Sequence, residues 1–219
     1  EMGHGSKKSF AQDIQVSIGG SPVSSGHLQD FGSINLLAAS SAITITIENI
    51  GSPEDLTVNT ISLGGTHAAD FNLTTSGLPV TLGPTASATF TISFSPLLSG
   101  VRTATIQIDS DDPDTNPFVI NLEGTGVKLD QTITFNPLNS VTFGDGSFAL
   151  SATSSSGLPV SYSSSNPLVA TISGNTITIV GAGTTTITAS QTGDDTYNPA
   201  LAVDQNLLVN KATPVITWN

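Results

Sequence analysis

The stretch ITITIEN at residues 43–49 decides the fold class of this chain. Ile43, Ile45 and Ile47 alternate with polar residues, so one face of the segment is apolar and the other is polar. Successive side chains of a β-strand point to opposite faces of a sheet, so this period of two predicts a half-buried strand. Similar runs recur between clusters of Gly, Pro, Asn and Asp, which favours an all-β fold.

The predicted strands form two sets. The first set comprises 13–18, 43–49, 56–63, 71–74, 87–94, 101–109 and 117–124. The second set comprises 131–135, 147–153, 159–163, 168–173, 175–180, 184–190 and 203–210. The segment VKLD at 127–130 is interpreted as a linker. We therefore expect two tandem immunoglobulin-like β-sandwiches at 13–127 and 128–211, preceded by an N-terminal extension at 1–12.

The charge balance excludes several classes of partner. The 219 residues contain 17 Asp and Glu against 5 Lys and Arg, which gives a net charge of −12. Nucleic acids and anionic membrane surfaces are bound through basic patches, so we expect neither as a partner. The chain has no Cys, which excludes disulfides and thiolate metal sites. It also has no apolar run of about 18 residues, so we expect no membrane insertion in this segment.

The end of the sequence repeats an earlier segment. KLDQTITFN at 128–136 aligns with KATPVITWN at 211–219, where Lys, Ile, Thr, an aromatic residue and Asn recur in register. Residues 212–219 are therefore interpreted either as the first strand of a further repeat or as a donor strand for another subunit. For strand donation the candidate binding residues are Pro214, Val215, Ile216, Thr217 and Trp218. Because the first residue is Glu rather than Met, we expect the chain to derive from a longer protein.

Longer segments resemble known families. In the first set these are DFG (30–32), ITITIENIGS (43–52), DFNL (70–73) and TLGPTASATFTISFSPLLSGVRTATIQIDSDDPDTNPFVINLEGTG (81–126). They resemble the abnormal-spindle/Hydin-type immunoglobulin-like domain, called choice-of-anchor D in bacterial surface proteins. The segment SSGLPVSYSSSNPLVATISGNTITIVGAGTTTITASQTGDDTYNPA (154–200) is similar to bacterial immunoglobulin-like repeats, notably of Bacteroidetes. Both resemblances imply extracellular stalk, adhesin or assembly modules on the bacterial cell surface, without shared catalytic residues.

Four aspartates form the densest acidic cluster. Asp109, Asp111, Asp112 and Asp114 lie in the turn expected between the strands at 101–109 and 117–124. Calcium takes several carboxylate and carbonyl oxygens at once, so this cluster is a candidate calcium site, and calcium is the one cofactor that the sequence suggests. The alternative is a solvated turn whose polar side chains bond to their own backbone. The spacing lacks the Gly and bidentate Glu of an EF-hand loop, which favours the turn.

The other polar and aromatic residues give little support for catalysis. The three His residues show no zinc-binding spacing, and we expect His4, His27 and His67 to lie on the surface or in loops. Neither a G-x-S-x-G elbow nor a phosphate-binding loop is present. The GAG segment at 181–183 is interpreted as a hairpin. We therefore expect that the chain is not an enzyme.

The aromatic residues are predicted to be structural. Phe90 and Phe94 lie on apolar strand faces and are assigned to the core. Glycan-binding sandwiches stack sugar rings on exposed aromatic residues, and this chain offers only Trp218, Tyr162 and Tyr197 for that purpose. Tyr197 precedes a Pro turn, and we expect its hydroxyl to return to the backbone as in a tyrosine corner.

These observations favour a non-catalytic extracellular structural or adhesion module, either a stalk segment or a subunit of a cell-surface fibre or adhesin. The expected partners are neighbouring immunoglobulin-like domains, copies of the chain itself, or an unknown surface protein or glycan. The alternative is a ligand-binding accessory module of a secreted enzyme, which would recognise a glycan or a protein through loops at one end of the first sandwich.

Overall fold

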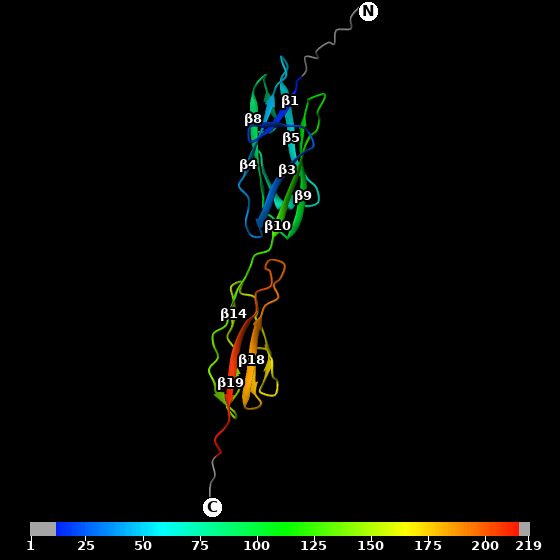
Figure 1. Ribbon diagram of the computed structural model, residues 1–219. Coiled ribbons are helices and arrows are strands. Elements are labelled where there is room, and N and C mark those ends of the chain that lie inside the picture. The colour runs from blue at the N-terminus through cyan, green and yellow to red at the C-terminus, as the bar shows by residue number, and fades with distance from the viewer. Residues whose placement is uncertain (1–11, 215–219) are drawn as a thin grey trace, which may run out of the picture. The chain divides into compact units, whose positions relative to one another are not determined.

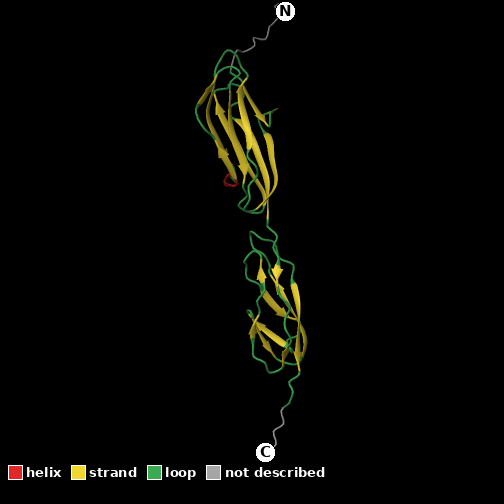
Figure 2. Ribbon diagram, turned by 90° about the vertical axis from the view of Figure 1, so that its left-hand side faces the viewer, coloured by secondary structure: helices red, strands yellow, loops and turns green. Residues whose placement is uncertain are grey.

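The computed structural model describes residues 12–214, and the chain divides into two compact units. The first unit ends at Val127 and the second begins at Lys128. Each unit consists of β-strands joined by turns and loops (Figures 1 and 2). The helical element in the described residues is a single 3-10 turn at Ala68–Asp70. No helix in this part of the chain is long and apolar enough to cross a membrane.

The first unit contains two five-stranded sheets. Their orders are β2-β1-β4-β8-β6 and β3-β10-β9-β5-β7. The strands are β1 (Ile14–Ile18), β2 (Ser21–Val23), β3 (His27–Asn35), β4 (Ile43–Asn49), β5 (Leu56–Gly64), β6 (Phe71–Thr74), β7 (Val80–Leu82), β8 (Ser87–Phe94), β9 (Gly100–Ser110) and β10 (Phe118–Val127).

The second unit is built from shorter strands. Its sheets have the orders β12-β19-β18-β15, β13-β17-β16 and β11-β14. The strands are β11 (Ile133–Thr134), β12 (Val141–Thr142), β13 (Phe148–Ala149), β14 (Thr153–Ser154), β15 (Ser161–Ser164), β16 (Ala170–Ser173), β17 (Thr176–Ile179), β18 (Gly183–Ser190) and β19 (Val203–Asn210).

Both units have the strand arrangement of an immunoglobulin-like sandwich. In the first unit β1, β4, β8 and β6 form one layer, while β5, β9 and β10 are the central strands of the other. The last strand, β10, lies between β9, which is antiparallel to it, and β3, which is parallel to it. In the second unit the last strand, β19, lies likewise between antiparallel β18 and parallel β12. The predicted all-β fold with two sandwiches is confirmed.

Each unit has its own hydrophobic core. Phe90 and Phe94 are buried in the first core as predicted. The ring centroids of Phe71 and Phe94 lie 4.9 Å apart, and the ring of Phe31 lies 5.7 Å from that of Phe71. The second core is centred on Ile177, Ile187 and Leu207, which are fully buried. Burial of these apolar faces is the main force that holds each sandwich together.

Several short or irregular strands escaped the sequence analysis, namely β2, β3, β7 and β12. The segment HLQDFGSIN of β3 lacks regular alternation because it bends at Gly32, whose φ of 67° is left-handed. Asp30 Oδ1 accepts a hydrogen bond of 2.7 Å from the Gly32 N–H and supports this bend. The GAG segment at 181–183 was wrongly interpreted as a hairpin, because it joins β17 to β18 in a different sheet.

Candidate functional site

The acidic turn joins β9 to β10, and Asp112 is its buried residue, with 3% of its surface exposed. Asp112 Oδ1 accepts hydrogen bonds of 2.7 Å from the N–H groups of Asp114 and Thr115. Its other oxygen, Oδ2, accepts a bond of 2.7 Å from the N–H of Ile14 at the start of β1. One carboxylate therefore closes the turn and fixes the first strand of the sandwich to it.

The neighbours of Asp112 also bond to backbone. Asp111 Oδ1 accepts a hydrogen bond of 2.8 Å from the N–H of Thr57, near the start of β5. Asn116 Oδ1 accepts one of 3.1 Å from Ser110 N–H across the turn. Asp109 and Asp114 have exposed side chains, and Asp109 lies in β9, paired with Thr60, rather than in the predicted turn. The turn therefore corresponds to the structural alternative considered for this cluster.

The structure does not assemble the four aspartates into a calcium site. Among residues 12–214, no group of three or more His, Asp or Glu side chains could hold a metal ion. Three N–H groups already occupy most of the acceptor sites of the Asp112 carboxylate, so it has little left to offer a calcium ion. We therefore expect the same melting temperature in millimolar calcium and in chelator. A calcium-dependent rise that Asp112→Asn removes would contradict this expectation.

Asp13 lies beside the same cluster, and its pKa is raised. Partial desolvation raises the pKa of Asp13 above its ordinary value of 3.8, and the negative charges of Asp112 and Asp114 raise it further. The folded chain thus binds this proton more tightly than the unfolded chain, so ionisation of Asp13 at neutral pH opposes folding.

We expect Asp13→Asn to raise the melting temperature near pH 7. The gain should shrink as the pH falls through the raised pKa, because Asp13 of the unmodified chain then becomes neutral in the folded state. Thermal melts of both chains across the acidic range measure this. Asp109→Asn, at an exposed side chain near the end of β9, is the control for the general loss of one negative charge. A gain that persists unchanged at low pH would contradict the assignment.

A second buried carboxylate, missed from sequence, fixes the loop between β8 and β9. Asp70 is 3% exposed, and its Oδ1 accepts a hydrogen bond of 2.7 Å from Leu97 N–H. Its Oδ2 lies 3.6 Å from Nε of Arg102. Arg102 donates to the carbonyls of Leu98 and Ser99 at 3.1 and 2.8 Å. The one signal in the sequence was that Arg102 is its single arginine.

His27 and His67 lie far apart in the first unit's sequence, at an edge strand and beside the 3-10 turn. His67 Nδ1 accepts a hydrogen bond of 3.1 Å from Thr103 N–H. His27 is partly exposed at the start of the edge strand β3. His4 lies outside the described residues.

The tyrosine whose hydroxyl returns to backbone is Tyr162, and not Tyr197 as predicted. Tyr162 Oη accepts a hydrogen bond of 2.7 Å from Ala152 N–H, and its ring centroid lies 5.7 Å from that of Phe135. Tyr197 instead forms an isolated β-bridge with Leu129. Tyr162 is thus part of the packing of the second unit, which argues against a role as a sugar-stacking platform.

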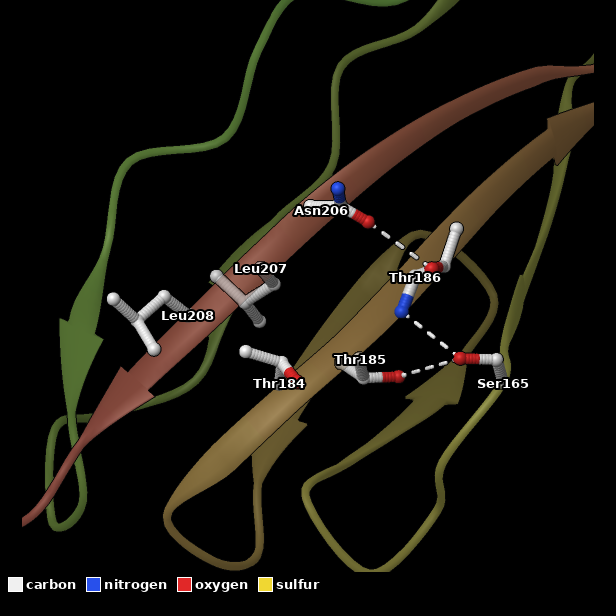
Figure 3. Close-up of a pocket in the computed structure, with 7 residues that line it drawn as sticks. All are labelled: Ser165, Thr184, Thr185, Thr186, Asn206, Leu207 and Leu208. Carbon is white, nitrogen blue, oxygen red and sulfur yellow. Dashed lines mark hydrogen bonds between the residues drawn. The ribbon is translucent and has the colours of Figure 1, made fainter.

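A shallow groove of about 390 Å³ crosses the outer face of β18 and β19 in the second unit (Figure 3). Thr186 Oγ1 donates to Asn206 Oδ1 at 3.1 Å, and Thr186 N–H donates to Ser165 Oγ at 2.9 Å. Leu208, 46% exposed, adds an apolar surface. The lining residues are Ser165, Thr184, Thr185, Thr186, Asn206, Leu207 and Leu208. The groove offers neutral hydroxyl and amide groups that suit a polar, uncharged ligand.

The candidate strand-donation residues lie almost wholly beyond the described part of the chain. Pro214 is described, and it is irregular and exposed. Val215, Ile216, Thr217 and Trp218 fall outside the described residues, as do residues 1–11 of the expected N-terminal extension.

The sequence matches no protein-family model and no curated protein. Solved structures give distant likenesses. The VesB protease of Vibrio cholerae shares 14% identity at a TM-score of 0.36, with 47% of this chain and 31% of that chain covered, so the chain spans about a third of that protease. The ASH / PapD-like domain 7 of human CEP192 shares 12% identity at a TM-score of 0.38, covering 58% of this chain and 94% of that chain.

A third likeness covers most of the chain. A protein of unknown function from Porphyromonas gingivalis W83 shares 13% identity at a TM-score of 0.35, covering 89% of this chain and 99% of that chain. At these TM-scores the likenesses carry no argument about function. The immunoglobulin-like arrangement of both units therefore rests on their own strand order.

Proposed function

We propose that this chain is a non-catalytic structural module of an extracellular protein, either a stalk segment or a subunit of a cell-surface fibre. The observation that carries the proposal is the use of its buried carboxylates. Asp70 and Asp112 both accept hydrogen bonds from backbone N–H groups and so join loops and strand ends of the sandwich itself. A reactive site needs polar groups that are free to contact a substrate, whereas these groups hold the scaffold together.

The pairing of the last strand also supports a mechanical role. In the first unit β3 and β10 run parallel over seven residue pairs, from Ile120 opposite His27 to Val127 opposite Asn35. Tension along the chain pulls such a parallel pair from opposite ends, so its hydrogen bonds bear the force together. The equivalent pair in the second unit, β12 with β19, has only two residue pairs.

We expect the second unit to unfold at a lower force than the first when the chain is stretched between its ends. Single-molecule force spectroscopy distinguishes the two events, because the longer first unit releases more chain. Ile34→Ala, which removes a partly buried side chain of β3, should lower the force of the first unit's event alone. Unfolding of the first unit at the lower force would contradict the mechanical argument.

The extracellular location and the partners of the chain are part of the same proposal. They rest on the resemblance of both units to repeats of surface proteins and on the net charge of −12, which disfavours polyanionic partners. The partners would be neighbouring immunoglobulin-like domains or further copies of the chain.

The groove on β18 and β19 favours the second candidate, a glycan-binding accessory module. Its hydroxyl and amide groups could bond to sugar hydroxyls, although these groups already bond to one another across the strands. Binding on a glycan array that is lost in Thr186→Val and kept in Thr178→Val, on the exposed part of β17, would favour this candidate over the structural module.

A further inference from the structure

The second unit holds its own first segment, residues 128–135, in a defined site. The backbone of Leu129 makes two hydrogen bonds to the loop that contains Thr196 and Asn198. Its N–H donates to Thr196 O at 2.9 Å, and its O accepts from Asn198 N–H at 2.8 Å. Further along, Thr132 N–H donates to Ser155 Oγ at 3.0 Å, and Thr132 O accepts from Ser155 N–H at 2.9 Å. These bonds are made by backbone atoms of the segment, so they do not depend on its side chains.

Two side chains of the segment fill the core. Ile133 and Phe135 are 9% and 6% exposed, and they alternate with the exposed Thr134. Phe135 packs against the ring of Tyr162, which is fixed by its hydrogen bond from Ala152 N–H. Gln205 donates to Phe135 O at 2.8 Å from the last strand. The site thus requires an apolar residue followed, two positions later, by an aromatic residue.

Three polar side chains of the segment add further contacts, and one of them is Asp130, whose Oδ1 accepts a hydrogen bond of 2.8 Å from Asn198 Nδ2. Lys128 Nζ donates to the carbonyl of Asp194. Gln131 Nε2 donates to Gln191 Oε1 and Asn198 O at 2.7 Å, while its Oε1 accepts from Ser156 Oγ at 2.5 Å. All three bonds of Gln131 involve its side chain.

Residues 211–219 carry the features that this site requires. In the alignment with 128–136, Lys211 matches Lys128, Ile216 matches Ile133 and Trp218 matches Phe135. Ala212 and Val215 retain the N–H groups that Leu129 and Thr132 use. Pro214 matches Gln131, whose three bonds come from the side chain, so a proline there sacrifices none of these backbone bonds but loses the side-chain bonds.

We propose that residues 211–219 of one chain replace residues 128–136 as the first strand of the second sandwich in another copy of the chain. This inference deepens the proposed function by naming the partner and the contact through which one subunit joins the next. The resident strand β11 pairs with β14 over only two residue pairs. Its tether gives it a high effective concentration, so a separate strand competes more readily when the resident strand is weakened.

The chain's single tryptophan, Trp218, provides the test. A peptide of residues 211–219 is added to a full chain that carries Phe135→Ala, to loosen the resident strand, and Trp218→Ala, so that the peptide is the one source of tryptophan emission. We expect a saturable shift of that emission to shorter wavelength as Trp218 enters the apolar site beside Tyr162. If the alanine variant fails to fold by circular dichroism, Phe135→Leu takes its place.

Matched controls make the result specific. A chain with Phe135 intact and Trp218→Ala should give the same shift only at higher peptide concentrations, because its resident strand competes with the peptide, and a peptide with Ile216→Asp should not bind. A peptide with Pro214→Gln should bind at least about fivefold more tightly, because it regains hydrogen bonds of Gln131. The absence of a shift in the folded, loosened chain would overturn the proposal.

Association of whole chains is the second arm. Sedimentation of the full chain with Phe135→Ala and Trp218 present should show concentration-dependent dimers or larger species, which Trp218→Ala abolishes. A loosened chain that binds the peptide but stays monomeric would overturn completion between copies. Failure of either arm leaves the stalk proposal standing, because the force measurement does not depend on docking of residues 211–219.

Discussion

Replacement of Phe94 by alanine is expected to lower the free energy of unfolding of the first unit by about 3–5 kcal/mol. Phe94 is fully buried and lies in the ring cluster with Phe31 and Phe71. Its ring also lies directly on the backbone of Gly124, where a Cβ would come within 2.5 Å of it. Glycine has no side chain that could move into the vacated space, so the cavity stays open. The loss of free energy of unfolding should therefore lie in the upper part of the range for such substitutions.

Urea unfolding of the whole chain measures this loss as an earlier transition of the first unit. Phe143→Ala, at a side chain that is 47% exposed in the second unit, is the control and should change stability by no more than about 0.5 kcal/mol. A loss below about 1 kcal/mol for Phe94→Ala would mean that the ring cluster does not hold the two sheets together.

Asp112→Ala is expected to cost about 3–4 kcal/mol in the first unit, close to the effect of the core change. The variant removes the acceptor for three N–H groups, those of Ile14, Asp114 and Thr115. The residue is buried, so water cannot readily replace the lost bonds. Chemical denaturation again provides the measurement.

A second variant of Asp112 and a variant of Asp109, near the end of β9, test the cause of this loss. Asp112→Asn keeps one oxygen acceptor but places an NH2 group where another accepted, so it should fall between the wild type and Asp112→Ala. Asp109→Ala changes an exposed carboxylate and should stay within about 0.5 kcal/mol. Equal losses for Asp109→Ala and Asp112→Ala would show that net charge, and not the buried bonds, stabilises the turn.

The long alternating strands were predictable because their burial follows the period of two. β4 and β8 bury Ile45, Ile47, Phe90 and Phe94 on one face, as their sequences indicated. β3 was missed because Gly32 bends it, and it is held by parallel pairing with β10 rather than by an alternating pattern. Pairing with a strand far along the chain leaves no local signature in the sequence.

The roles of the polar residues were harder to predict than the strands. The four aspartates of the turn were visible as a cluster, but only the folded chain shows that Asp112 faces Ile14, which lies far from it in the sequence. Asp70 had no visible partner, because Leu97 and Arg102 reach it only after β6 pairs with β8. The two tyrosines could not be distinguished without knowing that Ala152 lies beside Tyr162.

Immunogold electron microscopy of intact source cells, with an antibody against the two sandwiches, shows whether the chain is a structural module outside the cell. We expect label outside the envelope, on stalks or fibres that project from the surface, with intact cells labelled as strongly as permeabilised ones. Label that appears only after permeabilisation and lies inside the cell would contradict it.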